Sequence, residues 1–127
     1  MNLEKVLFGF FILLALTLNF GFFVGDIDNP DHHDELELFA AIVVSLVATV
    51  LKFGDRTHIG ALLLSTSLVA DLQLIAAAVV WGVGASGSET GISSAAMATV
   101  VSLSGGALLA NSASVVLLII ETVNVRR

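Results

Sequence analysis

The sequence predicts an all-α membrane protein: a single domain over residues 1–127, with four transmembrane helices in an up-down bundle and both termini in the cytoplasm. Hydrophobic residues make up 57% of the chain and charged residues only 13%, whereas a soluble domain carries about 25% charged residues. The apolar residues fall in four long runs that three short polar segments separate. Cysteine is absent, which excludes disulfides, thiolate metal sites and redox dithiols.

We expect the spans at about residues 6–24, 38–51, 60–83 and 92–120, with an acidic loop over 26–37 on the outer side. A run of about 20 residues, rising ~1.5 Å each, crosses the ~30 Å hydrocarbon core. A signal peptide is the alternative for the first run, because Lys5 precedes it. That run is longer than the usual h-region of about 7–15 residues, and no A-x-A-like cleavage site follows, so we interpret it as a retained helix.

The basic residues set the expected orientation. They lie only at the N-terminus, in the loop between the second and third runs, and at the C-terminus, as Lys5, Lys52, Arg56, Arg126 and Arg127. Cytoplasmic loops carry the excess of Lys and Arg, so this distribution places both termini in the cytoplasm. The formal net charge of −6 argues against nucleic acid as a partner.

An aspartate, Asp71, lies in the middle of the third run. An ionisable group at the bilayer centre costs about 2.5–3.5 kcal/mol on insertion scales, and it marks a functional site by default. Depth estimates from the helical rise bring polar side chains of three runs to nearly the same level. We therefore predict a midplane cluster that forms a cation or proton site, made of Asp71, Ser67, Asn111 and Asn19, with Gln73 and Ser104 as further candidates. The alternative is a protonated Asp71 that hydrogen-bonds Asn111 as a purely structural contact.

Small residues recur every fourth position in the last run. Such residues let helix backbones approach closely and drive association in lipid. The row predicts tight packing, either within the bundle or between protomers, and it consists of Ser94, Ala98, Ser102, Gly106, Ala110 and Ser114. Ser93, Ser104 and Asn111 lie on a roughly opposite face, which favours self-association or a larger complex. The Gly105–Gly106 pair allows a kink, and a long tilted helix is the alternative.

The outer loop is rich in carboxylates and also contains two imidazoles. Oxygen ligands suit Ca²⁺ or Mg²⁺, and imidazole extends the choice to transition metals. The metal candidates are Asp26, Asp28, Asp31, His32, His33, Asp34 and Glu37, with Glu35 beside them. Pro30 and Asp31 occupy the fifth and sixth positions of an EF-hand alignment, where the sixth must be glycine, so that motif fails. A solvated acidic turn, or a funnel that concentrates cations, is the favoured interpretation.

Motifs for an enzyme are absent from the sequence. The stretch GVGASG ends a membrane span and leads to no strand–helix unit, so it is no phosphate-binding loop. Neither G-x-S-x-G nor H-E-x-x-H occurs, and no filter of the TVGYG type is present. We expect no catalytic activity and no cofactor.

Two stretches, LFGFFILLALTLNFGFFVGDIDNPDHHDELELFAAIVV and LKFGDRTHIGALLL…SLVADLQLIAAAVVWG, resemble a family of small, uncharacterised four-span bacterial inner-membrane proteins. The resemblance covers most of the chain and implies a bacterial inner-membrane location, with no particular activity. The chain also resembles small multidrug transporters in size and number of spans. Those proteins carry a key glutamate in the first span, where this chain has Thr17 and Asn19, so that function is not adopted.

The sequence supports two functions from different classes. In the first, copies of the chain associate in the bilayer and line a cation or proton pathway through the Asp71 cluster. In the second, the chain is an accessory subunit that packs on another membrane protein, such as a cation channel or transporter, and conducts nothing itself.

Overall fold

The computed structural model describes residues 3–87 and 90–126, and these residues fold into four α-helices with one short 3₁₀ turn. Helix α1 spans Leu3–Phe23 and α2 spans Glu35–Lys52, and the 3₁₀ turn η1, Pro30–His32, lies between them. Helix α3 spans His58–Ser86 and α4 spans Ser94–Arg126. The all-helical prediction is confirmed for the described residues.

Helices α1, α3 and α4 are long and apolar enough to cross a membrane. The fourth expected span, 38–51, lies inside α2, which has 18 residues and carries Glu35, Glu37 and Lys52 near its ends. Helix α4 continues past the expected end at residue 120, because its polar tail contains neither proline nor glycine to stop it. The Gly105–Gly106 pair does not interrupt α4.

Polar side chains accept hydrogen bonds from the backbone at the starts of α2 and α3. Asp34 accepts a bond from the backbone N–H of Leu36 (2.9 Å), and Thr57 accepts one from that of Gly60 (3.0 Å). These N-caps satisfy donors that the first helical turn leaves without an intrahelical acceptor. The acidic residues in the first turn of α2 and the basic residue in its last turn also have the opposite sign to the partial charges at the two helix ends, which is favourable.

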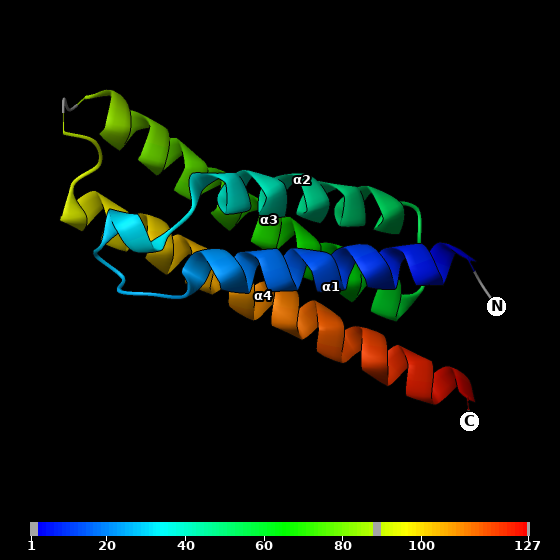
Figure 1. Ribbon diagram of the computed structural model, residues 1–127. Coiled ribbons are helices and arrows are strands. Elements are labelled where there is room, and N and C mark those ends of the chain that lie inside the picture. The colour runs from blue at the N-terminus through cyan, green and yellow to red at the C-terminus, as the bar shows by residue number, and fades with distance from the viewer. Residues whose placement is uncertain (1–2, 88–89, 127) are drawn as a thin grey trace.

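The helices pack in ring order, since α1 contacts α2 and α4, α2 contacts α3, and α3 makes its most extensive contact with α4. Figure 1 shows that α3 and α4 diverge from the other two helices toward opposite ends of the molecule. The start of α1 and the end of α4 lie at the same end of the bundle, and the loop between α1 and α2 lies at the other. This arrangement is that of the predicted up-down bundle.

Two apolar clusters fill the interior. One contains Phe22, Leu38, Leu74 and Met97 toward the α1–α2 loop, and the other contains Phe8, Ile12, Ala48 and Leu63 toward the opposite end. On each helix a buried polar side chain falls, in sequence, between members of the two clusters: Asn19, Ser45, Ser67 and Asn111. A polar layer therefore divides the core.

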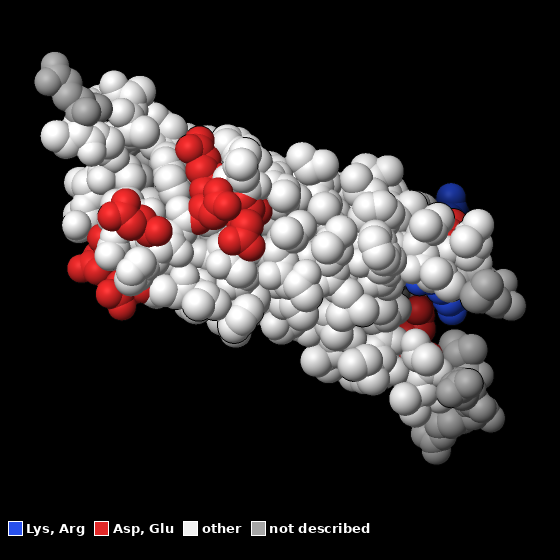
Figure 2. Space-filling view, in the orientation of Figure 1, with Lys and Arg blue, Asp and Glu red and all other residues white. Residues whose placement is uncertain are grey.

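The exterior of the bundle is apolar and its charges gather at the ends. Outward-facing side chains such as Leu72 and Leu109 are 70% and 73% exposed, which suits a hydrocarbon environment better than water. Figure 2 shows a cluster of acidic residues toward the end with the α1–α2 loop, basic residues with a few acidic ones beside them at the opposite end, and a broad uncharged band between the two ends. Such a band is the surface expected of a protein that resides in a membrane.

Candidate functional site

Asp71 lies near the middle of α3, points into the bundle and is 5% exposed. Both of its carboxylate oxygens are bonded to hydroxyl groups of α2. The Ser45 hydroxyl donates to Oδ1 (2.6 Å), and the Thr49 hydroxyl lies 2.5 Å from Oδ2. A carboxyl group, two hydroxyls and the two helices that hold them form the central site of the molecule.

The spacing of residues along α2 explains why both hydroxyls reach Asp71. Ser45 and Thr49 are four residues apart and therefore share one helix face. The same buried face carries Ala41 and Ala48, whose small side chains let α2 approach α3 closely. The site follows from a small-residue face of α2 packed against the face of α3 that bears Asp71.

The hydroxyl of Thr49 has two oxygen neighbours but only one proton. Its Oγ1 lies within hydrogen-bond distance of the Ser45 carbonyl oxygen (2.9 Å) as well as Asp71 Oδ2. When Asp71 is ionised, Thr49 donates to the carboxylate. When Asp71 is protonated, its own O–H donates to Thr49, which turns and donates to the Ser45 carbonyl. The network is satisfied in both protonation states through rotation of one hydroxyl.

The structure divides the predicted midplane cluster between two places. Asn19 of α1 and Asn111 of α4 are both fully buried, and they lie together at the α1–α4 contact, while Asp71 is bonded to α2. The amide of Asn19, oriented so that its nitrogen faces α4, donates to the Ser104 carbonyl (3.0 Å). Its oxygen then accepts from the backbone N–H of Leu108 (3.0 Å) and from Asn111 Nδ2 (3.1 Å). This second group ties α1 to about two turns of α4.

Ser67 lies one turn before Asp71 on the buried face of α3. Its Oγ has no hydrogen-bond partner among the described residues, and neither does Gln73 Oε1. A buried hydroxyl without a partner is uncommon, because it keeps its desolvation cost with no bond to offset it. Ser67 is thus an available oxygen beside the Asp71 site.

Sequence reasoning missed Ser45 and Thr49. The available signal was their four-residue spacing, in the run that otherwise contains only apolar residues between positions 38 and 51. Hydroxyl residues are common in membrane helices, where they also bond to their own backbone, so this signal is weak without knowledge of which faces meet.

The small residues of the row on α4 lie partly at the contact with α3 and partly on the outer surface. Ser114 bonds to Thr66 of α3 (2.5 Å), and Gly106 packs against the amide of Gln73. Ser94 and Ser102 are exposed, and Ala98 and Ala110 are partly exposed. Four residues turn a helix by about 40° more than a full circle, so the row winds around α4 from the α3 contact to the outer surface.

The outer loop uses its polar residues to hold its own shape. Within residues 3–87 and 90–126, no three His, Asp or Glu side chains come together as a metal-binding group. His33 places Nδ1 at 2.6 Å from the Phe22 carbonyl oxygen and Nε2 at 2.8 Å from that of Asp26. His32 Nδ1 accepts from the backbone N–H of Asp26 (2.9 Å). His33 thus fastens the loop to the end of α1, and His32 holds two parts of the loop together.

Gly25 is required in this loop for its backbone conformation. Its φ is +116°, in the region that favours glycine, and a Cβ there would lie 2.6 Å from Cβ of His32. Of the other metal candidates, Asp34 caps α2, the backbone N–H of Asp31 donates to Asn29, and Glu37 lies over Gly21 of α1.

No match to this chain was found among curated proteins or among solved structures. A family of unknown function, DUF6394, matches residues 32–122. The matched part includes Asp71, Ser45 and Thr49 but begins after Asn19. Because it extends over more than half of the sequence, the chain belongs to the family of unknown function DUF6394.

Proposed function

We propose that this protein forms a pathway for protons or small cations across a membrane, with Asp71 as the group that binds and releases the transported ion. The observation that supports this function is the pair of hydroxyls on the Asp71 carboxyl group, Ser45 and Thr49. A buried acid that only holds helices together needs one stable protonation state. In this acid each carboxyl oxygen keeps a hydroxyl partner in two protonation states.

The geometry favours a proton over a metal cation. Proton uptake requires only that Thr49 turn between Asp71 Oδ2 and the Ser45 carbonyl, and no atom needs to leave the site. A monovalent cation would instead use the oxygens of Asp71, Ser45 and Thr49 together with the unpartnered Ser67 hydroxyl. The two cases differ in which ion crosses, so a flux measurement separates them.

The proposed setting is the bacterial inner membrane, crossed four times, with both termini in the cytoplasm. In this setting α2 is the additional span, and its apolar centre lies between acidic residues at one end and Lys52 at the other. The absence of Lys and Arg from the loops over 24–34 and 87–93 supports the orientation. The acidic outer loop then attracts cations toward one side of the pathway.

Self-association is part of the proposal. The exposed members of the small-residue row, Ser94 and Ser102, give α4 an outer surface on which another helix can approach closely. A four-helix chain leaves little space for a pathway within itself, so contacts between copies would complete it. The same surface suits a different membrane protein, and this supports the second candidate, an accessory subunit without conduction of its own.

The test is proton and cation flux in liposomes that contain only this purified protein. We expect flux for the natural sequence and none above protein-free liposomes for Asp71→Asn, which keeps the shape of the side chain but cannot ionise. Thr49→Val should lower the flux by about tenfold, the effect of losing one hydrogen bond to a charged group. Thr17→Val is the matched control, since Thr17 is exposed and bonds only to the Leu14 carbonyl of its own helix.

Unchanged flux in a folded Asp71→Asn variant would show that the pathway does not use this carboxyl group. Absence of flux for protons and for every monovalent cation tested would contradict conduction and favour the accessory subunit. An equal decrease in flux in Thr49→Val and Thr17→Val would show that the Thr49 hydroxyl of α2 has no special role.

A further inference from the structure

His33 differs from the other two histidines of the chain in its surroundings. It lies in the α1–α2 loop and is 5% exposed, whereas His32 and His58 are exposed. Both nitrogens of its ring face oxygen atoms of the main chain. The Phe22 carbonyl lies 2.6 Å from Nδ1, and the Asp26 carbonyl lies 2.8 Å from Nε2. The imidazole is thus enclosed between two hydrogen-bond acceptors.

This geometry requires a proton on each nitrogen of the ring. A carbonyl oxygen accepts hydrogen bonds and donates none, and a neutral imidazole has one N–H and one nitrogen with a lone pair. In the neutral ring of His33, a lone pair would therefore face a carbonyl oxygen at 2.6 or 2.8 Å, which is repulsive. The protonated ring has an N–H at both nitrogens, so both contacts become charge-assisted hydrogen bonds.

The position of Phe22 adds to the preference for a charged ring. Phe22 belongs to the last turn of α1, where carbonyl groups lack an intrahelical donor and form the negative end of the helix dipole. Helix α1 has no basic residue of its own in this turn. Burial of His33 disfavours a charge, and the two carbonyl contacts and the helix end oppose that effect.

The charged groups around His33 are all acidic. The loop and the first turn of α2 contain no Lys or Arg, and their carboxylates are those of Asp26, Asp28, Asp31, Asp34, Glu35 and Glu37. Among the described residues, the one imidazole with a carboxylate oxygen within 4.0 Å is His32, beside Asp26 (3.9 Å). The other three helices contain no ionisable side chain over residues 6–23, 72–86 and 94–120. The field of the loop therefore favours a positive charge on His33, and no single carboxylate neutralises it.

His32 has the opposite requirement. Its Nδ1 accepts a hydrogen bond from the backbone N–H of Asp26 (2.9 Å), which needs a lone pair on that nitrogen. Acid therefore breaks this contact, while it completes the two contacts of His33. An effect of pH on the loop has to be assigned to one of the two rings by separate variants.

We infer that His33 is a proton-binding site that fastens the α1–α2 loop to the end of α1 when it is protonated. Loss of the proton leaves one of the two carbonyls facing a lone pair, so the ring turns or the loop moves away. Histidine changes charge between about pH 5 and 8, so the loop responds to the proton concentration on its own side of the membrane. The inference does not depend on ion conduction through the Asp71 site.

The apolar core beside this site contains its own reporter. The ring of Phe22 contacts the ring of His33 (centroids 5.5 Å apart) and the ring of Trp81 in α3 (5.8 Å). Trp81 is the only tryptophan of the chain, which contains no tyrosine. A movement of His33 away from Phe22 therefore changes the surroundings of the single tryptophan fluorophore.

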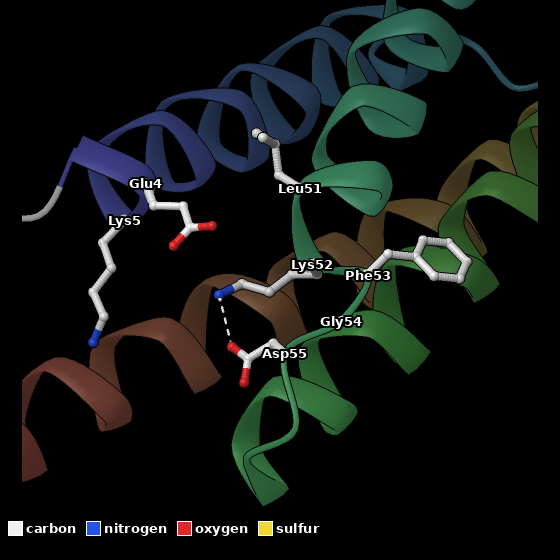
Figure 3. Close-up of a pocket in the computed structure, with 7 residues that line it drawn as sticks. All are labelled: Glu4, Lys5, Leu51, Lys52, Phe53, Gly54 and Asp55. Carbon is white, nitrogen blue, oxygen red and sulfur yellow. Dashed lines mark hydrogen bonds and ion pairs between the residues drawn. The ribbon is translucent and has the colours of Figure 1, made fainter.

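The opposite end of the bundle supplies a control. There the charged side chains pair in their ordinary ionised states. Figure 3 shows Lys52 bonded to Asp55 (3.3 Å), and Lys5 lies 3.9 Å from Glu121. His58 is the exposed first residue of α3 at this end. Its replacement removes a histidine without altering the loop between α1 and α2.

The first test is nitrogen NMR of the full chain, labelled at histidine, in detergent micelles from about pH 5 to 8. The three ring signals are assigned with His32→Gln and His58→Gln, each of which removes one of them. We expect His33 to keep a proton on both nitrogens at a pH at which His58 has lost one. Loss of the proton from His33 at the same pH as from His58, or at a lower pH, would overturn the proton site.

The second test is the fluorescence emission of Trp81 over the same range of pH. We expect the emission of the natural sequence to change as His33 loses its proton. His33→Gln should abolish this change, because an amide can donate to one carbonyl but cannot take up a proton. His32→Gln and His58→Gln should retain it.

The fluorescence comparison can contradict the inference in two ways. A change that persists in a folded His33→Gln variant, or that disappears in His32→Gln, would assign the response to another group. Constant emission of the natural sequence across this range would show that the loop stays fastened without the proton. The NMR measurement on the natural sequence decides the protonation of His33 even if His33→Gln does not fold.

Discussion

Asp55 and Asp71 accept hydrogen bonds from hydroxyl groups in two different settings. Asp71 is buried among helices, and its two hydroxyl neighbours serve both protonation states. Asp55 lies in the turn before α3, where the Thr57 hydroxyl (2.7 Å) and backbone N–H (3.0 Å) both meet Oδ1, and Lys52 meets Oδ2. The first arrangement keeps the carboxyl group away from solvent, and the second favours a negative charge on Asp55 at neutral pH.

The stability of the turn should depend on pH through Asp55. The Thr57 hydroxyl, then its backbone N–H, and to a smaller extent Lys52 lower the pKa of Asp55 below 3.8, although burial acts in the opposite direction. A depressed pKa in the folded state stabilises the fold above the unfolded-state pKa, and this contribution is lost as the pH falls through the folded-state pKa. The melting temperature should therefore decrease as the pH falls below about 3.8.

Thr57→Val removes the hydroxyl that lowers this pKa and also the N-cap of α3. We expect the stability at neutral pH to be lower by about 1 kcal/mol. The melting temperature should also depend less steeply on pH in the acid range, as measured by circular dichroism in mild detergent. Thr57→Ser keeps a hydroxyl and should resemble the natural sequence. An unaltered acid dependence in Thr57→Val would contradict this role for Asp55.

At the scale of helices, the contact between α1 and α4 depends on how closely the two backbones approach. α1 and α4 are joined by the Asn19–Asn111 group and, one turn along α1, by the ring of Phe23 against Gly105. A side chain at Gly105 would push Phe23 away, because a Cβ there would lie 2.9 Å from Phe23 Cε1. Gly82 of α3 has nothing within 4 Å of such a position. The two glycines therefore differ only in what surrounds them.

Gly105→Ala should destabilise the fold by about 1–2 kcal/mol, the usual cost of an added group in a packed contact. Gly82→Ala should be neutral or stabilising by up to about 1 kcal/mol, because alanine is the better helix former. Thermal unfolding of the two variants in the same detergent makes the comparison. The same response from both would show that the α1–α4 contact is looser than the distances indicate.

At the scale of the whole molecule, the bundle has an apolar exterior, charged ends and a polar layer across its middle. The polar layer lies between the two apolar clusters, so it is kept from both ends of the bundle by packed side chains. Asp71, the ion-binding group that we propose, is bonded to Ser45 of this layer and is 5% exposed, so a single copy encloses it. A complete pathway of the kind that we propose would need contact with another copy along a helix surface that reaches this layer.

The absence of cysteine makes self-association simple to measure. Ser102→Cys, on the exposed part of the small-residue row, should form disulfide-linked dimers in membranes if copies meet along α4. Leu72→Cys is the control, since Leu72 is 70% exposed on α3 and lies outside the row. No more dimer from Ser102→Cys than from Leu72→Cys would contradict association through this surface.

The sequence by itself determined the helical class and the approximate positions of the helices, and it predicted that polar side chains of several helices lie at a similar level. These depend on the lengths of apolar runs and on a fixed rise per residue, which are local properties. It also identified Asp71 as the unusual group, because a carboxylate inside an apolar run is conspicuous whatever surrounds it. Helix ends were less accurate, since hydrogen bonding continues into polar segments such as the tail of α4.

Only the tertiary structure decided which polar groups meet. Residues at equal depth on four helices can pair in several ways, and the choice depends on helix rotation and neighbour order, which depth does not specify. The order α1–α2–α3–α4 around the ring places Ser45 and Thr49 at Asp71 and leaves Asn19 and Asn111 to each other. Which side chains pair across helices depends on which helix faces pack together. That packing depends on contacts between segments far apart in the sequence, so no single segment specifies it.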